Sequence, residues 1–402
     1  MAKNAKMAAD KKELEDLVCA LGENRLPLRR SCMEGTRTTI LQEIEDKIKN
    51  VNAPNVIWIR GSSGIGKSSL AASIASQLED QKRHVISFRF DRIQSTTITT
   101  NVLWHAVACD LARLHLSLRS YLTQSTQGHS SSDIDRLFKL LIEEPLFTLA
   151  DDVLHEELPV IVIDALDECG GLKHDESGKE DLQSLMRTLK RWTQVDHLKK
   201  FKVVITSRPE DCIALPDSIS IYEIPSGSNV KSGDDAFKDI HAFLKSQLDD
   251  MKMKAGWIAK ALDHLVPCAA GIFIWAMTAA NFLESDPESR FAMLEKGNGK
   301  GLKGLYPLYS TVLKASFGHD LEDEEIGAMT SVIGAMIFAK KLLDDDVLIM
   351  LPQVKIPDSN VNRLGLIRKG LASVIDSGPI LHFHHRSFED FLLSTFFSTR
   401  AT

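Results

Sequence analysis

The sequence predicts an α/β fold in which a parallel sheet is flanked by helices and followed by a largely helical region. Five short apolar runs, separated by stretches with helical spacing, carry this prediction: 56–59, 85–90, 159–163, 201–205 and 219–224. The run 56–59 is continuously apolar and the run 159–163 nearly so, as a parallel sheet covered on both faces requires. The first run leads directly into a glycine-rich loop, and a helical pattern follows that loop.

The N-terminal segment, residues 1–50, is predicted to be helical and polar. Apolar residues recur at helical spacing in 8–21 and again in 37–48. The stretch 28–37 between them has the character of a loop. The acidic and basic residues of this segment leave no apolar run of the length that a signal peptide needs, which favours a cytoplasmic protein.

The sheet domain is predicted at 51–225. It includes a mostly helical insertion at 97–152, and the Ser/Thr/Gln/Gly-rich part of that insertion, 123–133, is expected to be a loop. Residues 226–300 follow as a helical subdomain after a polar linker. Residues 301–402 are mainly helical, with a short apolar strand near 379–383.

Composition argues against several classes of function. A formal net charge of −7 gives no global basic field for nucleic acid. The six cysteines form no CxxC pair and have no metal-ligand spacing with a histidine. The run 266–283 carries no formal charge, but its proline, asparagine and alanines favour a buried helix over a membrane span.

The loop after the first strand has the sequence G-x-x-x-x-G-K-S, which is a phosphate loop. Glycines let backbone N–H groups converge on a phosphate, and the following helix directs its N-terminal dipole at the same anion. We expect the lysine to neutralise the β- and γ-phosphates and the first serine to ligate Mg²⁺. The alternative is a glycine-rich turn with an exposed lysine. The predicted binding set is Gly61, Ser62, Ser63, Gly64, Ile65, Gly66, Lys67, Ser68 and Ser69.

Carboxylates follow the third apolar run. Asp164 ends that run, at the sheet edge where open α/β folds bind ligands, and is expected to hold Mg²⁺. Asp167 and Glu168 follow within one turn, and either could polarise the attacking water. A solvated acidic turn is the alternative for all three. Arg208, after the fourth run, would reach the γ-phosphate if its strand neighbours that of Asp164; otherwise it would bind a surface carboxylate.

These motifs together resemble a known family. The phosphate loop, the segment 160–168 and the segment 203–209 are similar to the NACHT domain of STAND NTPases, and more narrowly to fungal NOD-like receptors with a nephrocystin-3-like nucleotide domain. A small residue after the first aspartate, here Ala165, with acidic residues two and three positions further on, is typical of NACHT modules. The resemblance implies a P-loop NTPase sheet followed by a helical subdomain and a winged-helix subdomain.

Weaker similarities extend over about residues 28–395. The segment 32–37 resembles the one that lies near the base in such proteins, which implies a nucleotide role for Thr36 and Arg37. The segment 270–276 resembles the motif of the helical subdomain. The segment 385–392 resembles a winged-helix motif whose histidine contacts the bound diphosphate, and His385 stands at that position. A metal held by His382, His384 and His385, or three histidines in solvent, are the alternatives.

The resemblance implies a nucleotide-dependent switch with Mg²⁺ and ATP/ADP or GTP/GDP as cofactors. It also implies slow hydrolysis, a homo-oligomer when activated, and a role in immunity-like or incompatibility signalling with protein partners. Members normally carry an effector domain before the core and a sensor array after it, so we expect a fragment, a truncated member or a core that works with separate partners. A constitutive NTPase or small-molecule kinase, and a non-catalytic nucleotide-bound scaffold, are the alternatives.

Overall fold

The structure, a computed structural model, describes most of the chain. The described residues are 25–92, 94, 97–115, 118, 119, 121, 122, 133–149, 157–170, 176–209, 219–296, 304–316, 323–339, 343–351, 354, 363–376, 378 and 380–398. They form two compact units, and each is described by itself. The first comprises Met1–Ser62 with Lys67–Ile224, and the second comprises Ser63–Gly66 with Pro225–Thr402. The predicted helix at 8–21 lies outside the described residues.

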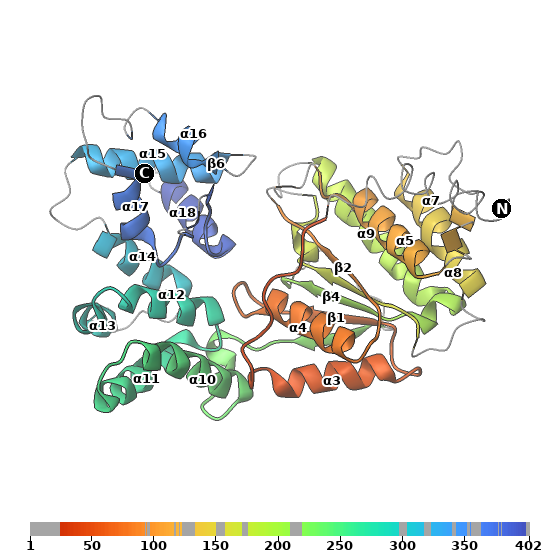
Figure 1. The fold of residues 1–402 in the computed structure, drawn as a ribbon, viewed down its shortest axis with the longest axis horizontal. Helices are drawn as coiled ribbons and strands as arrows, with labels where there is room; N and C mark the ends of the chain where they lie inside the picture. Colours follow the sequence, from red (N-terminus) through yellow and green to blue (C-terminus); the bar gives the residue numbers. More distant parts are fainter. Residues whose placement is uncertain are drawn as a thin grey trace, which may run out of the picture. The chain divides into compact units, whose positions relative to one another are not determined.

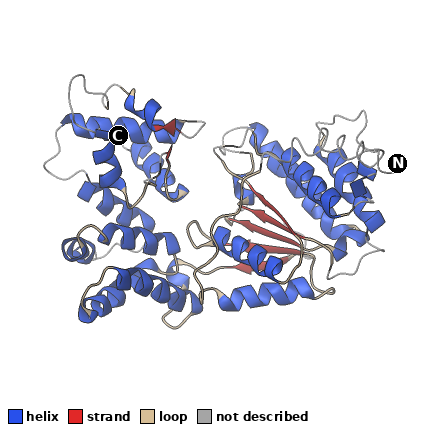
Figure 2. Ribbon diagram, viewed as in Figure 1, coloured by secondary structure: helices blue, strands red, loops and turns tan. Residues whose placement is uncertain are grey.

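A five-stranded parallel sheet forms the centre of the first unit (Figures 1 and 2), in the order β2-β3-β4-β1-β5. Its strands are β1 Val56–Arg60, β2 Val85–Arg89, β3 Val160–Asp164, β4 Val203–Ser207 and β5 Ser220–Glu223. Every neighbouring pair is parallel. Each of the five predicted runs therefore forms a strand, and the predicted parallel sheet is confirmed.

Helices cover both faces of this sheet, which explains the continuous burial of β1, β3 and β4. Helices α3 (Thr38–Lys49) and α4 (Lys67–Asp80) lie on one face, and α5 (Thr100–Leu114) and α9 (Glu176–Gln194) lie on the other (Figure 1). Val56 and Trp58 of β1 belong to the core shared with α5 and α9. The intervening Ile57 is equally buried but does not belong to that core, as period-two alternation requires.

The insertion between β2 and β3 is helical where it is described. After α5 come α7 (Ile134–Phe138), the π-helical turn η2 (Lys139–Glu143) and α8 (Glu144–Leu149). Asp133 caps α7, because its Oδ1 accepts hydrogen bonds from the backbone N–H groups of Asp135 and Arg136. The rest of the predicted loop, 123–132, lies outside the described residues. Trp104, Phe138 and Trp192 pack their rings together and join the insertion to α9.

The second unit is mostly helical. Its helices are α10 (Asp235–Asp250), α11 (Ala255–Ala269), α12 (Phe273–Leu283), α13 (Pro287–Lys296), α14 (Leu305–Ser316), α15 (Asp323–Phe338), α16 (Asp345–Ile349), α17 (Arg363–Leu371) and α18 (Arg386–Ser398). Two short strands, β6 (Leu343–Asp344) and β7 (Ile380–Leu381), pair antiparallel. One apolar core runs from Ile240 to Leu392. The division at 300 and the winged-helix assignment of 301–402 stay predictions.

The uncharged run 266–283 is not one buried helix, and that expectation is wrong. It is divided between the end of α11 and the whole of α12, because Ala270 and Gly271 both adopt left-handed backbone angles, with φ of 47° and 80°. A side chain on Gly271 would bring its Cβ within 2.9 Å of Val230. Among the residues that the structure describes, no helix combines the length and the apolar character needed to cross a membrane.

Candidate functional site

The phosphate loop connects β1 to α4, so the predicted strand–loop–helix context is confirmed. Gly64 and Gly66 have φ values of 79° and 93°, a conformation that side-chain-bearing residues rarely adopt. The loop lysine bends back over the loop, and Nζ of Lys67 donates to the carbonyls of Gly61 at 2.8 Å and Ser62 at 2.9 Å. The ammonium group thus lies within the loop rather than in bulk solvent, which excludes the exposed-lysine alternative.

Burial lowers the pKa of Lys67 from its ordinary value of 10.5 to about 8. Asp167 is the largest opposing influence, Arg208 lowers the pKa further, and Asp164 and Glu168 raise it. The lysine therefore shares one electrostatic environment with the four charged residues predicted at the ends of β3 and β4. Such a perturbed cation is typical of a site that receives an anion.

The tip of the loop, Ser63–Gly66, packs within the second unit. The N–H of Ile274, in the first turn of α12, donates to the carbonyl of Gly64 at 2.9 Å. A Cβ on Gly64 would lie 2.0 Å from Cγ2 of Ile274, so a glycine is required there by both space and backbone angle. Oγ of Ser63 is buried and has no hydrogen-bond partner among the described residues.

Asp164 lies at the carboxyl end of β3 and is fully buried. Its Oδ1 accepts a hydrogen bond from the Thr206 hydroxyl at 2.5 Å. Its Oδ2 is buried too, and within the described part of the chain nothing donates to it. An unpaired buried carboxylate oxygen is costly unless a ligand satisfies it. Together with the hydroxyl of Ser68 in the first turn of α4, this oxygen fits the oxygen-donor set that Mg²⁺ prefers.

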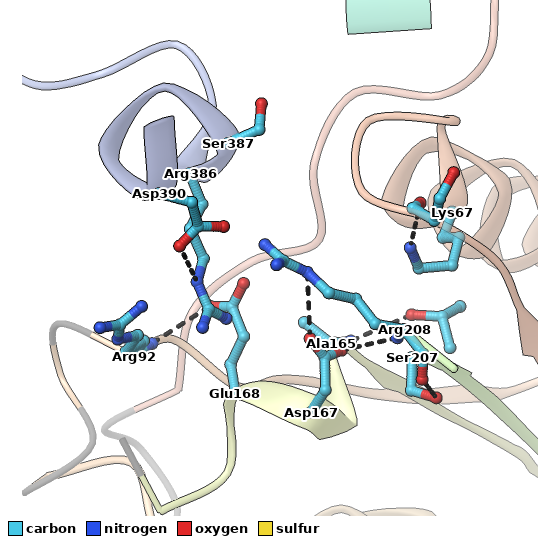
Figure 3. A network of polar contacts seen from close by, with 12 residues as sticks. Lys67, Arg92, Ala165, Asp167, Glu168, Ser207, Arg208, Arg386, Ser387 and Asp390 are labelled. Carbon is cyan, nitrogen blue, oxygen red and sulfur yellow. Dashed lines mark hydrogen bonds and ion pairs between the residues drawn. The ribbon is translucent and has the colours of Figure 1, made fainter. Parts of the chain in front are cut away.

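The two carboxylates after Asp164 have different partners (Figure 3). Ala165 takes a left-handed conformation, φ 58°, and starts a tight turn over Leu166–Glu168. Oδ1 of Asp167 accepts the backbone N–H of Arg208 at 3.0 Å, and Oδ2 lies 3.5 Å from Nε of the same residue. Oε2 of Glu168 accepts the backbone N–H of Arg92 at 3.1 Å. Asp167 is therefore not a solvated surface carboxylate, because its side chain is only 5% exposed, whereas Glu168 is half-buried.

Arg208 directly follows β4, and β4 lies between β3 and β1. The strand of Arg208 therefore neighbours that of Asp164, which is the arrangement that the expected approach of Arg208 to the γ-phosphate requires. The carboxylate that it contacts is the buried Asp167 of the candidate site rather than a surface group. Ser207, the last residue of β4, accepts a hydrogen bond from the indole of Trp58 at 2.8 Å, which anchors the strand end beside β1.

The structure also locates the residues implied by the weaker similarities. Thr36 and Arg37 are buried immediately before α3, where the Thr36 hydroxyl donates to the carbonyl of Met33 at 2.7 Å. His385 lies in the second unit and immediately precedes α18. Its Nδ1 accepts the backbone N–H of Ser387 at 3.1 Å, so the ring caps that helix. The nucleotide contacts of Thr36, Arg37 and His385 stay predictions.

The histidine trio does not gather around a common point. His384 Nε2 lies 3.1 Å from the carbonyl of Ala372, and His382 Nε2 lies 3.5 Å from a carboxylate oxygen of Asp376. Across the described ranges, no group of three or more histidine, cysteine, aspartate or glutamate side chains is arranged to hold a metal ion.

Two residues that contact the site, Thr206 and Arg92, were not predicted from the sequence. Thr206 fixes Asp164 and also accepts the backbone N–H of Ala165 at 3.0 Å. Arg92 holds Glu168 through its backbone N–H. Thr206 carried a signal, because it directly follows the fourth apolar run and stands two residues before Arg208. Arg92 carried none, since a backbone contact does not depend on the identity of the side chain.

Comparison with known proteins agrees with this geometry. Residues 35–208 match the family described as nephrocystin 3, N-terminal. No curated protein matches the chain. Solved structures that resemble it include a Signal Transduction ATPase with Numerous Domains (STAND) protein with a tetratricopeptide repeat sensor from Pyrococcus horikoshii, at 15% identity and a TM-score of 0.47. That match covers 92% of this chain and 44% of the other, so the chain spans less than half the length of that protein.

Two further structures resemble the chain over most of its length. The Walker-type ATPase of Pyrococcus abyssi is 14% identical with a TM-score of 0.38, and the match covers 91% of this chain and 99% of that one. Cdc6p from Pyrobaculum aerophilum is 13% identical with a TM-score of 0.38, and the match covers 93% and 97%. The family match covers residues 35–208, and this part of the chain, which carries the phosphate loop and the strand-end carboxylates, is similar to the nephrocystin 3 N-terminal domain.

Proposed function

We propose that the NACHT-like domain binds a Mg²⁺–nucleoside triphosphate and hydrolyses it slowly, and that the identity of the bound nucleotide switches the protein between two states. The observation that carries this proposal is that the site contains both Lys67, held within the phosphate loop, and the buried Asp164, whose Oδ2 has no hydrogen-bond partner among the described residues. A lysine for phosphate and a carboxylate for metal are the two charged groups that phosphoryl transfer requires of its protein.

The remaining roles follow from where each side chain lies. The loop amides and the N-terminus of α4 would hold the β-phosphate, and Lys67 would bridge the β- and γ-phosphates. Ser68 and Asp164 would hold Mg²⁺. When bound, the metal offsets charge on the phosphate oxygens. Thr206 keeps one oxygen of Asp164 occupied, which leaves the other oriented for the metal side.

We assign different roles to the carboxylates of Asp167 and Glu168. Asp167 is bound to the backbone N–H and guanidinium of Arg208, so we assign it the positioning of that arginine. Glu168 is fixed through Arg92 and is half-buried, and we assign it the polarisation of the attacking water. Arg208 would then contact the γ-phosphate and distinguish triphosphate from diphosphate.

The wider role is that of the family that the sequence resembles. In this proposal exchange of diphosphate for triphosphate promotes assembly of several copies in the cytoplasm, as part of immunity-like or incompatibility signalling with protein partners for sensing and output. A ligand shifts a two-state equilibrium only through different contacts in the two states. Arg208 is our candidate in the sheet unit, and His385 is our candidate in the helical unit.

Nucleotide content tests the binding proposal. Purified protein is denatured and the released nucleotide is identified, alongside a Lys67→Ala variant and an Arg187→Ala control on the exposed face of α9. We expect one nucleotide per chain from the unchanged protein and the control, and none from Lys67→Ala. Absence of heat in calorimetric titrations of stripped, folded protein with Mg·ATP and Mg·GTP would overturn the proposal.

Size-exclusion chromatography tests the switch. Profiles are compared with diphosphate and with a non-hydrolysable triphosphate, and a larger species is expected with the triphosphate. Steady turnover with no change in size would indicate a constitutive NTPase. Stoichiometric nucleotide with neither turnover nor a change in size would indicate a scaffold that keeps nucleotide for stability.

A further inference from the structure

An arginine on the far side of Asp164 has no role in the proposed function. Arg89 is the last residue of β2, and in the parallel register it lies opposite Asp164 on β3. Paired residues of neighbouring parallel strands direct their side chains to the same face of a sheet. Arg89 therefore lies beside the metal-side aspartate, at the carboxyl edge where the ligands of α/β folds bind.

The guanidinium of Arg89 is poorly satisfied by the protein. Its Nε is buried and has no hydrogen-bond partner within the described residues. Its terminal nitrogen lies 3.9 Å from Asp91, which is too long for a hydrogen bond, although the Arg89 side chain is only 17% exposed. Buried guanidinium groups are normally paired with carboxylate or phosphate. The unpaired Nε–H of Arg89 therefore indicates a ligand whose oxygen accepts its hydrogen bond.

A second arginine acts on Arg89 electrostatically. Burial lowers the pKa of Arg89, and the next influence is the guanidinium of Arg29, which lowers it further. Asp91, Asp164 and Glu168 act in the opposite sense. Arg29 comes from the segment before α3, so the fold brings two arginines from distant parts of the chain into one electrostatic environment. A bound Mg²⁺ would offset the charge of Asp164 and leave the two arginines attractive to an anion.

The strand order places Arg89 opposite Arg208. The order β2-β3-β4 puts Arg89 on one side of Asp164 and Arg208 on the other. Neighbouring strands are about 4.8 Å apart, so the two arginine-bearing strand ends lie on the order of 10 Å apart. Arginine side chains that extend from both ends can approach a group held over β3. A tetrahedral phosphate with three terminal oxygens fits this arrangement, because each guanidinium presents a planar pair of donors.

We propose that Arg89, assisted by Arg29, binds the terminal phosphate oxygens on the side of Asp164 opposite Arg208, as a second determinant of triphosphate over diphosphate. This inference rests on the proposed nucleotide binding and extends it to β2. The ligand is a tetrahedral phosphate dianion. It is present either as the γ-phosphate of the nucleotide or as inorganic phosphate after cleavage.

The test compares two affinities of the full chain after nucleotide is stripped. Calorimetry measures dissociation constants for Mg²⁺ complexes of a diphosphate and of a non-hydrolysable triphosphate, in the adenine and guanine series. In Arg89→Ala we expect the triphosphate affinity to fall at least about tenfold, with the diphosphate affinity changed less than about twofold. Arg89→Lys should retain part of the preference. Arg29→Ala should show a smaller loss of the same kind, and the exposed Arg187→Ala should show none.

The outcomes separate this inference from the proposed function. An unchanged ratio of triphosphate to diphosphate affinity in Arg89→Ala would overturn the role of Arg89, even if both affinities fell together. Failure of the unchanged protein to bind either nucleotide would overturn the nucleotide proposal itself. If Arg89→Ala does not fold, as thermal melts would reveal, the ratio in Arg89→Lys and Arg29→Ala decides the matter.

A second arm identifies the source of the phosphate. Inorganic phosphate is titrated into the diphosphate-bound protein and into the same complex of Arg89→Ala. Binding that the variant lacks would show that the site also retains the cleaved phosphate. Absence of such binding, with the triphosphate preference still dependent on Arg89, would restrict the site to the nucleotide's own γ-phosphate.

Discussion

The Thr206 hydroxyl donates to Oδ1 of Asp164 across 2.5 Å, between two neighbouring strands and with neither residue exposed to solvent. The same hydroxyl oxygen accepts the backbone N–H of Ala165 at 3.0 Å. One side chain thus fixes both the metal-side carboxylate and the start of the turn that carries Asp167 and Glu168. The orientation of the acidic group is set from β4, not from the strand on which it lies.

Replacement of Thr206 by valine removes this donor and keeps the shape of the side chain. A buried carboxylate oxygen then has no partner, and we expect a loss of about 1–3 kcal/mol in the free energy of unfolding, measured with urea. Thr206→Ser retains the hydroxyl and should lose less. Equal stability of the valine variant and the unchanged protein would show that the bond contributes nothing.

The pKa of Lys67 predicts how nucleotide affinity depends on pH. Burial lowers that pKa to about 8, so in the nucleotide-free protein the ammonium group loses its proton as pH rises through that value. Phosphate binds the charged form better, so the affinity for Mg·nucleotide should fall from about pH 7 to about pH 9, with proton uptake on binding. Calorimetry in two buffers of different ionisation enthalpy measures both effects.

The matched control for the pH experiment is another buried lysine. Burial also lowers the pKa of Lys202 to about 8, but its Nζ donates to the carbonyls of Asn50 and Ala53 before β1, at the opposite end of β4 from the site. Lys67→Arg keeps its charge over this range and should remove the pH dependence of whatever binding it retains, whereas Lys202→Met should preserve it. A dependence that survives in Lys67→Arg would assign it to another group.

The division of work between the two carboxylates predicts different kinetic defects. Glu168→Gln should reduce the rate of hydrolysis at least about a hundredfold with nucleotide affinity nearly unchanged, because it removes the base and keeps the shape. Asp167→Asn should instead reduce the preference for triphosphate, since it weakens the hold on Arg208. Single-turnover assays and binding titrations measure the two quantities. The opposite pattern would exchange the two roles.

The packing of the loop tip predicts a coupled pair of substitutions within the helical unit. Gly64→Ala places a Cβ 2.0 Å from Ile274 Cγ2 and requires a left-handed alanine, so we expect weak nucleotide binding and reduced thermal stability. Ile274→Ala removes the 2.0 Å contact but leaves its own Cβ 3.0 Å away and leaves the backbone cost of about 1–2 kcal/mol. The double variant should therefore recover part of the stability lost in Gly64→Ala. Strict additivity of the two single effects would contradict the contact.

Local sequence patterns predicted most of the first unit. The five apolar runs, the phosphate loop and the acidic strand end are each readable from a few consecutive residues, because strand burial and anion binding at a helix N-terminus are local requirements. The same reasoning failed at 266–283. Hydrophobicity there is continuous, and the break at Ala270 and Gly271 depends on backbone angles that the composition of the run does not reveal.

The sequence by itself determined that this protein has a phosphate loop on a parallel sheet, with carboxylates and an arginine at the ends of later strands. Only the tertiary structure decided which of these groups meet. The strand order β2-β3-β4 brings Thr206 to Asp164, Arg208 to Asp167 and Arg89 beside them, although more than forty residues separate some of these partners. The residue types at the end of a strand can be identified from a few consecutive positions. Which strands lie next to it depends on how the whole sheet buries its two faces.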